Sequence, residues 1–233
     1  MNYAIIAAGE GSRLVQEGVA LPKPLVNLGG EPMIKRLIDI MLRCNAESIS
    51  IIVNNEMPAV RRFISELTLP VPLNLVVKST PSSMHSFYEV SRGFGSGKFV
   101  LTTVDTVFRE PDFRRYVQAF EADDTADGYM GVTSFIDDEK PLYVAVDSDA
   151  TMNITAFLDS PVPGVKYVSA GIYGLTHPAL EVLAHCMDTG VSRMRNYQRA
   201  LVAAGLHLKA YPLSKVIDVD HASDIATAEA LIS

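Results

Sequence analysis

In the first half of the chain, short continuous runs of apolar residues alternate with stretches in which apolar residues recur at helical spacing. The runs are rich in β-branched residues and bounded by polar or turn residues, which is typical of strands buried on both faces of a parallel sheet. The predicted strands are Tyr3–Ala7, Ile49–Val53, Leu73–Val77 and Phe99–Thr103. The predicted helices between them are Met33–Arg43, Met57–Leu67 and Met84–Gly93. This alternation predicts right-handed βαβ units.

The second half begins with apolar runs that follow one another through short polar turns. They predict strands without intervening helices, which would add antiparallel or mixed strands at one side of the sheet. These strands are Gly128–Phe135, Leu142–Asp147, Met152–Phe157 and Tyr167–Leu175. The elements expected after them are the helices Ala179–Cys186 and Val191–Ala204, the strand His207–Tyr211 and a helix from Ala222 to Leu231.

Together the two patterns predict an α/β fold of three layers, with a Rossmann-like, mostly parallel mixed sheet and helices on both of its faces. No linker rich in Pro, Gly or Ser interrupts the 233 residues, so a single domain is expected over 1–233.

Composition excludes several kinds of partner. The chain has 20 Lys and Arg against 27 Asp and Glu, a net charge of -7, which disfavours binding to nucleic acid through bulk positive charge. Cys44 and Cys186 lie far apart and in no metal-binding pattern, so reduced thiols are expected. No run of 18 apolar residues and no signal peptide is apparent. We therefore expect a cytoplasmic protein without membrane or nucleic-acid partners; the sequence is compatible with a homo-oligomer.

A glycine-containing loop, AAGEGSRL, follows the first strand. Gly9 and Gly11 permit tight turns and let backbone N–H groups approach a ligand closely. A dinucleotide-binding fingerprint would need a third glycine where Leu14 stands, which disfavours a nicotinamide dehydrogenase, and a P-loop would need Gly-Lys-Ser/Thr where Gly-Ser-Arg stands. The remaining interpretation makes Arg13 a phosphate contact. A second cation, Lys23, lies between two prolines in LPKPL, which fix the direction of its backbone.

The combination AAGEGSRL…PKPLVNLGGEPMI resembles the signature of a nucleotidyltransferase family that includes sugar-1-phosphate nucleotidyltransferases and phosphocholine cytidylyltransferases. The resemblance implies Mg²⁺-dependent transfer of a nucleoside monophosphate from an NTP to a small phosphorylated acceptor, with release of pyrophosphate. It makes 1–125 the nucleotide-binding half and 126–233 the acceptor-binding half. Arg13 would bind the β- and γ-phosphates and Lys23 the α-phosphate or the acceptor phosphate. The nucleotide-binding residues implied at this end are Ala7, Ala8, Gly9, Glu10, Gly11, Ser12, Arg13 and Lys23.

Three aspartates are candidates for the metal site. Asp105 follows the strand Phe99–Thr103, where ligands bind in open α/β sheets. Asp218 and Asp220 alternate on an extended segment before the last helix, and the family has a second acid in this region. We expect Mg²⁺ on Asp105 and on one of these two. The alternatives are an Asx-turn at Asp105 and helix capping by Asp220 or, in the first turn, by Asp224.

A cluster of serines lies near the start of a predicted helix, in KSTPSSMHSFYEV. Ser82, Ser83 and Ser86 are expected to contact the base or a phosphate, because hydroxyls and free N–H groups meet at a helix N-terminus. The alternative is a simple helix cap by Ser82 or Ser83.

The acceptor site departs from the sugar-specific pattern. AFLDSP stands where those relatives have Glu-Lys-Pro, and the EKP at 139–141 lies one strand too early. Lys166 is the expected substitute for the missing lysine, and Ser169 and Gly171 fit the family segment that lines the acceptor pocket. The acceptor is left open between a sugar-1-phosphate, phosphocholine and an alditol phosphate. The alternative to an enzyme is a degenerate, non-catalytic homologue that binds nucleotide in a regulatory role.

Overall fold

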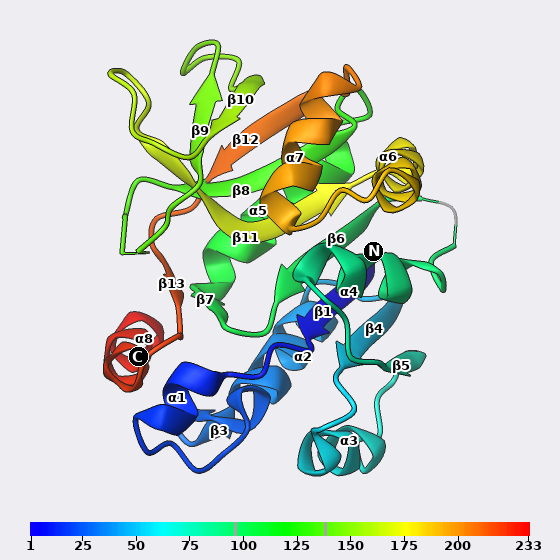
Figure 1. Ribbon diagram of the computed structural model, residues 1–233, viewed down its shortest axis with the longest axis vertical. Coiled ribbons are helices and arrows are strands. Elements are labelled where there is room, and N and C mark those ends of the chain that lie inside the picture. The colour runs from blue at the N-terminus through cyan, green and yellow to red at the C-terminus, as the bar shows by residue number, and fades with distance from the viewer. Residues whose placement is uncertain (96, 138) are drawn as a thin grey trace.

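The computed structural model describes residues 1–95, 97–137 and 139–233, and within these ranges its centre is a nine-stranded mixed sheet (Figure 1). Its parallel part has the order β6-β1-β4-β5. These strands are β1 (Asn2–Ala7), β4 (Ser48–Val53), β5 (Leu73–Val77) and β6 (Phe99–Thr103). The four strands predicted for the first half are therefore confirmed, each within one residue of its expected bounds.

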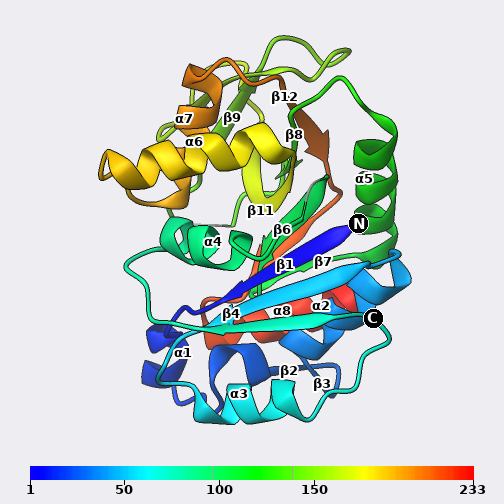
Figure 2. The same ribbon diagram turned by 90° about the vertical axis from the view of Figure 1, so that its right-hand side faces the viewer.

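The helices of the first half are α2 (Met33–Arg43), α3 (Pro58–Ser65) and α4 (Ser83–Ser91), close to the predicted bounds. Alternate residues of β1 separate two apolar layers. Tyr3 and Ile5 pack with α2, α3 and α5 on one face, whereas Ala4 and Ile6 pack with α4, α6 and α7 on the other. Figure 2 shows these two helical layers around the sheet. The predicted three-layer α/β fold is thus confirmed.

The antiparallel part of the sheet comes from the second half of the chain. The long strand β11 (Tyr167–Leu175) pairs antiparallel with β6 and with β8 (Gly128–Thr133). β9 (Tyr143–Val146) and β10 (Ile154–Leu158) extend the sheet beyond β11, and β12 (Leu208–Pro212) runs parallel to β8. The expected antiparallel addition is present.

The remaining helices of the second half also follow the prediction. α6 (His177–Asp188) and α7 (Met194–Ala203) pack together over β11, and α8 (Ala222–Ile232) covers a smaller apolar cluster near the N-terminal loop. None of the helices in the described ranges has both the length and the apolar character needed to cross a membrane.

The helix α5 (Glu110–Ala122) was not predicted, although the sequence contains its signals. Pro111 stands in the first turn beside Glu110 and Asp112, as is common at helix starts. Its apolar face recurs at helical spacing and is fully buried. The residues of that face are Phe113, Tyr116, Val117 and Phe120.

A small two-stranded ribbon connects distant parts of the chain. β7 (Thr106–Phe108) pairs antiparallel with β13 (Val216–Asp218), and Asp218 lies opposite Thr106. Two further short strands, β2 (Asn27–Leu28) and β3 (Glu31–Pro32), form a hairpin after Lys23. The β7–β13 ribbon brings the segment before α8 next to the residue that follows β6.

Candidate active site

The loop after β1 turns through Gly9–Gly11 and leads into a short helix, α1 (Ser12–Gln16). Gly11 has φ +63°, a left-handed conformation that glycine adopts readily. A Cβ atom on Gly11 would lie only 2.9 Å from Cβ of Lys23. Glycine at this position therefore allows the loop to pack directly against the lysine stem.

Lys23 begins a single 3₁₀ turn, Lys23–Leu25, and is only 8% exposed. Its Nζ lies 2.5 Å from Asp105 Oδ2 and 2.6 Å from Asp220 Oδ1. Burial alone would lower the pKa of Lys23, but the charge of Asp105 and the hydrogen bonds to both carboxylates raise it above its usual value. The lysine is thus a charged group that connects two acids 115 positions apart in sequence.

The acids themselves are positioned by the β7–β13 ribbon. The backbone N–H of Val219 donates to the carbonyl oxygen of Asp105 over 3.0 Å, and Thr106 Oγ1 donates to Asp218 Oδ1 over 3.0 Å. Backbone pairing therefore holds the carboxyl end of β6 against the 218–220 segment. The burial of Asp220 opposes ionisation, but its hydrogen bond to Lys23 and the charges of Lys23 and Arg13 lower its pKa overall.

Asp224 has the structural role that was considered as an alternative for this region. Its Oδ2 accepts hydrogen bonds from the backbone N–H groups of Asp220, at 3.0 Å, and His221, at 2.7 Å. His221 is the residue at the N-cap of α8, so Asp220 lies before the cap and its carboxylate faces Lys23 instead.

One cavity, which we call the loop cavity, has a volume of about 500 Å³ and lies above the carboxyl ends of the parallel strands. It is lined by most of the residues expected to bind nucleotide: Ala8, Gly9, Glu10, Gly11, Ser12, Lys23, Ser82, Ser83, Ser86 and also Asp105. Two of the expected residues do not line it: Ala7 is buried at the end of β1, at 1% exposure, and Arg13 lines a different cavity. Residues that were not anticipated in its lining are Asn54, Glu56, Ser79 and Thr80.

The unanticipated residues follow β4 and β5, so their position after buried strands was a usable signal. Asn54 donates from Nδ2 to the carbonyl oxygen of Ala8 at 3.0 Å and accepts from the N–H of Glu56 at 2.9 Å. It therefore ties the glycine loop to the end of the neighbouring strand.

The serines lie at the start of α4, as expected, and Ser82 occupies the N-cap position. Its side chain does not cap the helix; Ser82 Oγ lies 2.9 Å from His85 Nδ1. Ser86 Oγ lies 2.6 Å from Thr80 Oγ1. These contacts hold the hydroxyls at the wall of the loop cavity.

A second cavity, the α7 cavity, has a volume of about 300 Å³ and lies between β11, the start of α7 and the aspartates. Ser169 and Gly171 line it, together with Asp105, Asp218 and Asp220. Its cationic residues are Lys140, Arg193 and Arg195. Arg195 Nη1 contacts Asp159 at 2.7 Å and its Nη2 donates to the carbonyl oxygen of Lys140 at 2.9 Å.

Lys166 is not brought to this place. Its Nζ lies 2.7 Å from Asp149 Oδ2, its side chain is half exposed, and it is not among the described residues that line the α7 cavity. The cations found there instead belong to the segment SRMRNYQRA, in which arginines recur every two to four residues. That spacing at a helix start was the signal that could have identified Arg193 and Arg195.

Gly171 lies where the pairing of β11 with β8 shifts register, between Ser169 and Tyr173. It has φ +69°, and a Cβ atom there would lie 2.7 Å from Thr106 Oγ1. The glycine thus permits a bulge of β11 beside the β7–β13 ribbon, where bulges often adjust side chains near a site.

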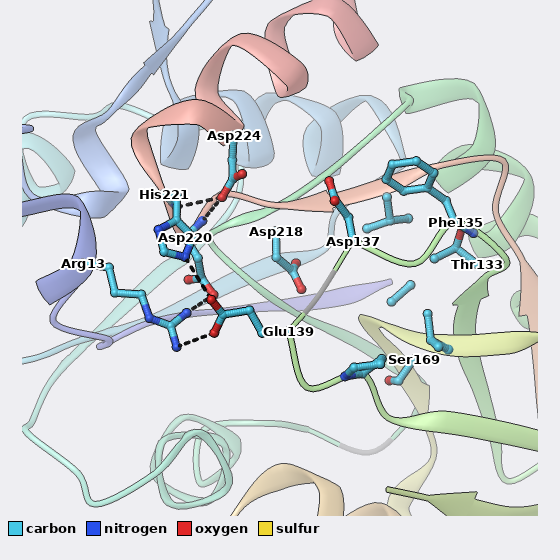
Figure 3. A pocket seen from close by; sticks show the side chains of 14 residues that line it. Arg13, Thr133, Phe135, Asp137, Glu139, Ser169, Asp218, Asp220, His221 and Asp224 are labelled. Atoms are coloured by element: carbon cyan, nitrogen blue, oxygen red, sulfur yellow. Dashed lines mark hydrogen bonds and ion pairs between the residues drawn. The ribbon is translucent and has the colours of Figure 1, made fainter. Parts of the chain in front are cut away.

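A third cavity, the Arg13 cavity, is shown in Figure 3. Arg13 Nη1 lies 3.2 Å from Asp220 Oδ2, and its Nη2 lies 3.7 Å from Glu139 Oε2. His221 Nδ1 lies 2.6 Å from Glu17 Oε1, and that hydrogen bond raises the pKa of the imidazole. Arg13, Lys23, Asp105 and the 218–220 segment therefore meet in one region, as the sequence interpretation required.

The donor set fits a divalent cation that prefers oxygen. Among the described residues no three His, Cys, Asp or Glu side chains are grouped as a complete metal site. Mg²⁺ typically takes only one or two protein carboxylates and completes its coordination with phosphate oxygens and water. Asp105 and Asp220 converge on one cation, Lys23, and Asp218 lines the same cavity.

The comparisons with known proteins agree with this geometry. A model of the MobA-like NTP transferase domain matches residues 3–159. The chain belongs to this family. The match covers the glycine loop, Lys23, the serines and Asp105, and it ends before β11.

The individual proteins that resemble this NTP transferase either have low sequence identity to it or match only a short part of it. A probable mannose-1-phosphate guanylyltransferase 1 of Oryza sativa is 25% identical over 189 residues, which cover 78% of this chain and 51% of the relative, so the chain spans about half of that protein. A 2-aminoethylphosphonate cytidylyltransferase of Lancefieldella rimae is 38% identical over 52 residues, which cover 22% of this chain and 21% of the relative. The structure of the inositol-1-phosphate CTP transferase from T. maritima matches with a TM-score of 0.81 at 18% identity, over 99% of this chain and 95% of that one, which supports the fold.

Proposed function

We propose that the protein is a Mg²⁺-dependent nucleotidyltransferase that moves a nucleoside monophosphate from an NTP to a small phosphorylated acceptor and releases pyrophosphate. The observation that carries this proposal is the position of Lys23. Lys23 lines the loop cavity, and its Nζ lies within 2.6 Å of carboxylates of Asp105 and Asp220, which line the α7 cavity. The lysine is therefore at the border of the two cavities. A cation at this border can contact both the nucleotide and the attacking group.

The reaction needs positioning and charge neutralisation more than proton transfer. An acceptor phosphate has a second pKa of about 6, so its oxygen is already anionic at neutral pH and can attack the α-phosphorus directly. The loop cavity would hold the nucleotide, with backbone N–H groups of Gly9–Ser12 on its phosphates. Arg13 would bind the β- and γ-phosphates, and Lys23 would contact the α-phosphate or the acceptor phosphate. The two adjoining cavities would then hold the attacking oxygen in line with the bond between the α-phosphorus and the leaving pyrophosphate.

Asp105 would hold the metal together with Asp218 or Asp220. Bound there, Mg²⁺ would polarise phosphate oxygens and neutralise their charge. Lys23 would exchange its two carboxylate partners for phosphate oxygens when the nucleotide binds. Arg13, which contacts the other oxygen of Asp220, would likewise exchange that carboxylate for phosphate oxygens.

We further propose that the α7 cavity binds the acceptor. Its basic side chains, Lys140, Arg193 and Arg195, suit a phosphate or phosphonate group. Relatives named for mannose 1-phosphate and for 2-aminoethylphosphonate indicate the range of acceptors, which here includes a sugar-1-phosphate, phosphocholine and an alditol phosphate.

The proposed location is the cytoplasm. The two free, buried thiols, Cys44 and Cys186, are in keeping with a protein that works in this reducing compartment.

A degenerate, non-catalytic homologue is less favoured. Loss of a charged group is the simplest way to lose activity, yet Arg13, Lys23, Asp105 and Asp220 are all present and in mutual contact. Each of these side chains would need a structural reason to persist in a protein that only binds nucleotide.

A turnover assay tests the proposal. Pyrophosphate release is measured with CTP, UTP, TTP and GTP, each combined with mannose 1-phosphate, glucose 1-phosphate, phosphocholine, 2-aminoethylphosphonate and an alditol phosphate, with Mg²⁺ and with EDTA. We expect release with at least one pair, and only when Mg²⁺ is present. NTP binding without release across the panel would instead support the non-catalytic homologue.

A further inference from the structure

A histidine that the sequence interpretation did not use lies beside Arg13. We propose that His221 and Arg13 together bind the terminal phosphates of the NTP, which leave as pyrophosphate, and that the Glu139 carboxylate competes for these two side chains. This inference rests on the proposed function and adds a substrate-contacting residue to it.

The imidazole of His221 has a defined orientation. Nδ1 lies 2.6 Å from Glu17 Oε1, and the other oxygen of Glu17 accepts the backbone N–H of Ala222 over 2.6 Å. Glu17 is in turn the residue that caps the C-terminal end of α1, the helix that carries Arg13. The bond at Nδ1 leaves Nε2 directed toward the Arg13 cavity, where it lies 3.7 Å from Glu139 Oε1.

Arg13 and His221 each lie beside one oxygen of the same carboxylate, that of Glu139. Arg13 Nη2 lies 3.7 Å from Glu139 Oε2, so each oxygen of Glu139 faces one of these two side chains (Figure 3). A carboxylate between two donors occupies the kind of place that a phosphate oxygen takes when it is bound by cationic side chains. Both contacts are long and the Glu139 side chain is 64% exposed, so a stronger anion can replace it.

Three other carboxylates around this place already have closer partners. Asp220 is bound by Lys23 and Arg13, Glu17 by His221 and the N–H of Ala222, and Asp224 by two backbone N–H groups. Their negative charge is therefore compensated within the protein. Asp137 and Asp218 also line the cavity, but Glu139 is the described acid that lies 3.7 Å from both Arg13 and His221, so it would have to move for a pyrophosphate group to reach them.

The test measures binding of pyrophosphate with Mg²⁺ by calorimetry, because pyrophosphate avoids the question of the base. The variants are Arg13→Ala, His221→Gln, His221→Asn and Glu139→Gln. His221→Gln keeps a polar side chain of similar length, and His221→Asn keeps a residue favoured at a helix N-cap. His185→Gln, on the exposed face of α6, and Glu66→Gln, at the end of α3, remove the same groups far from the site.

We expect both His221 variants to weaken pyrophosphate binding roughly tenfold, as loss of one charge-assisted contact does. The melting temperature should fall only slightly, because Gln and Asn can still donate a hydrogen bond to Glu17. Glu139→Gln should tighten binding a few-fold, and the two control variants should bind like the wild type. In kinetics, His221→Gln should raise KM for the NTP but not for the acceptor.

Two results would overturn the inference alone. In one, His221→Gln binds pyrophosphate like the wild type while Arg13→Ala has lost affinity. In the other, both His221 variants lose affinity and melting temperature in parallel, which indicates a structural role. If the wild type binds no pyrophosphate, or if Arg13→Ala binds it unchanged, the proposed nucleotide site itself is wrong.

Discussion

The loop cavity and the α7 cavity share Ser83, Thr103 and Asp105, but they are assembled in different ways. The loop cavity is built from segments that follow parallel strands: the glycine loop after β1, Asn54 after β4, Ser79 after β5 and Asp105 after β6. The α7 cavity combines the middle of the antiparallel strand β11 with the start of α7, Lys140 and the residues at the end of β13.

This difference explains how well each could be predicted. The carboxyl ends of parallel strands always meet at one edge of a sheet, so a polar residue after a buried run can be assigned to the site from sequence. An antiparallel strand has no such rule, because its neighbours run the other way and the site can meet it at any point. The lining of the loop cavity was therefore largely foreseen, whereas Ser169, Gly171 and the aspartates were foreseen in the α7 cavity but its arginines were not.

The strongest test concerns Asp105, which belongs to both cavities. Asp105→Asn keeps the shape of the side chain but removes a metal-binding charge, so we expect turnover to fall at least roughly 100-fold with both substrates at saturation. Asp149→Asn, which removes an exposed carboxylate paired with Lys166, serves as the matched control. Near-normal turnover of Asp105→Asn would mean that this residue does not hold the metal. The two cavities would then share no acid that catalysis requires.

Lys23 and Lys166 give the next largest contrast, because each pairs with aspartate but only Lys23 is buried. We expect Lys23→Ala to lower turnover roughly 100-fold, as loss of a cation on a transferring phosphoryl group does. It should also lower the melting temperature, because Asp105 and Asp220 lose a shared partner. Lys166→Ala should change turnover less than about two-fold, as expected for an exposed ion pair.

A large effect of Lys166→Ala on turnover would support the role in acceptor binding that was first predicted for this lysine. A Lys23→Ala protein that no longer folds would instead give its loop a mainly structural role. Circular dichroism of both variants distinguishes loss of folding from loss of catalysis.

Arg195 tests the acceptor side by itself. Arg195→Ala removes a cation from the α7 cavity, so KM for the acceptor should rise roughly tenfold, as expected for one charge-assisted hydrogen bond, whereas KM for the NTP should stay the same. Arg62→Ala removes an arginine from an exposed pair with Glu66 and serves as the control. A rise in KM for the NTP instead would mean that the two cavities do not divide the substrates as proposed.

The smallest expected effect is that of Gly171→Ala. The new Cβ atom meets Thr106 Oγ1 and the residue keeps a positive φ, so we expect a loss of about 1–2 kcal/mol in the free energy of unfolding. The bulge of β11 also shapes the acceptor side, so KM for the acceptor should rise a few-fold. Gly164→Ala, also at positive φ but with open space around its Cβ, separates backbone strain from the clash with Thr106. Equal effects of the two substitutions in denaturant unfolding would rule out that clash as the cause.

The sequence by itself determined the fold class and most of the residues that line the loop cavity. Buried strands and amphipathic helices have distinct periods, and the glycine loop with Lys23 between prolines is a local pattern that one segment contains completely. The helix α5 was missed although its apolar spacing and first-turn proline were visible, which was a failure of interpretation and not of the signal.

Only the tertiary structure decided which distant charges meet. Pairing of β7 with β13 brings Asp105 and Asp220 to the same lysine, and the contacts of His221 with Glu17 and Glu139 exist only in the folded chain. The same folding placed Arg193 and Arg195 in the lining of the α7 cavity and left Lys166 with Asp149. The physical reason is that long-range strand pairing depends on backbone hydrogen bonds and burial summed over the whole sheet. The position of a single charged residue in the sequence does not reveal which distant strand will lie beside it.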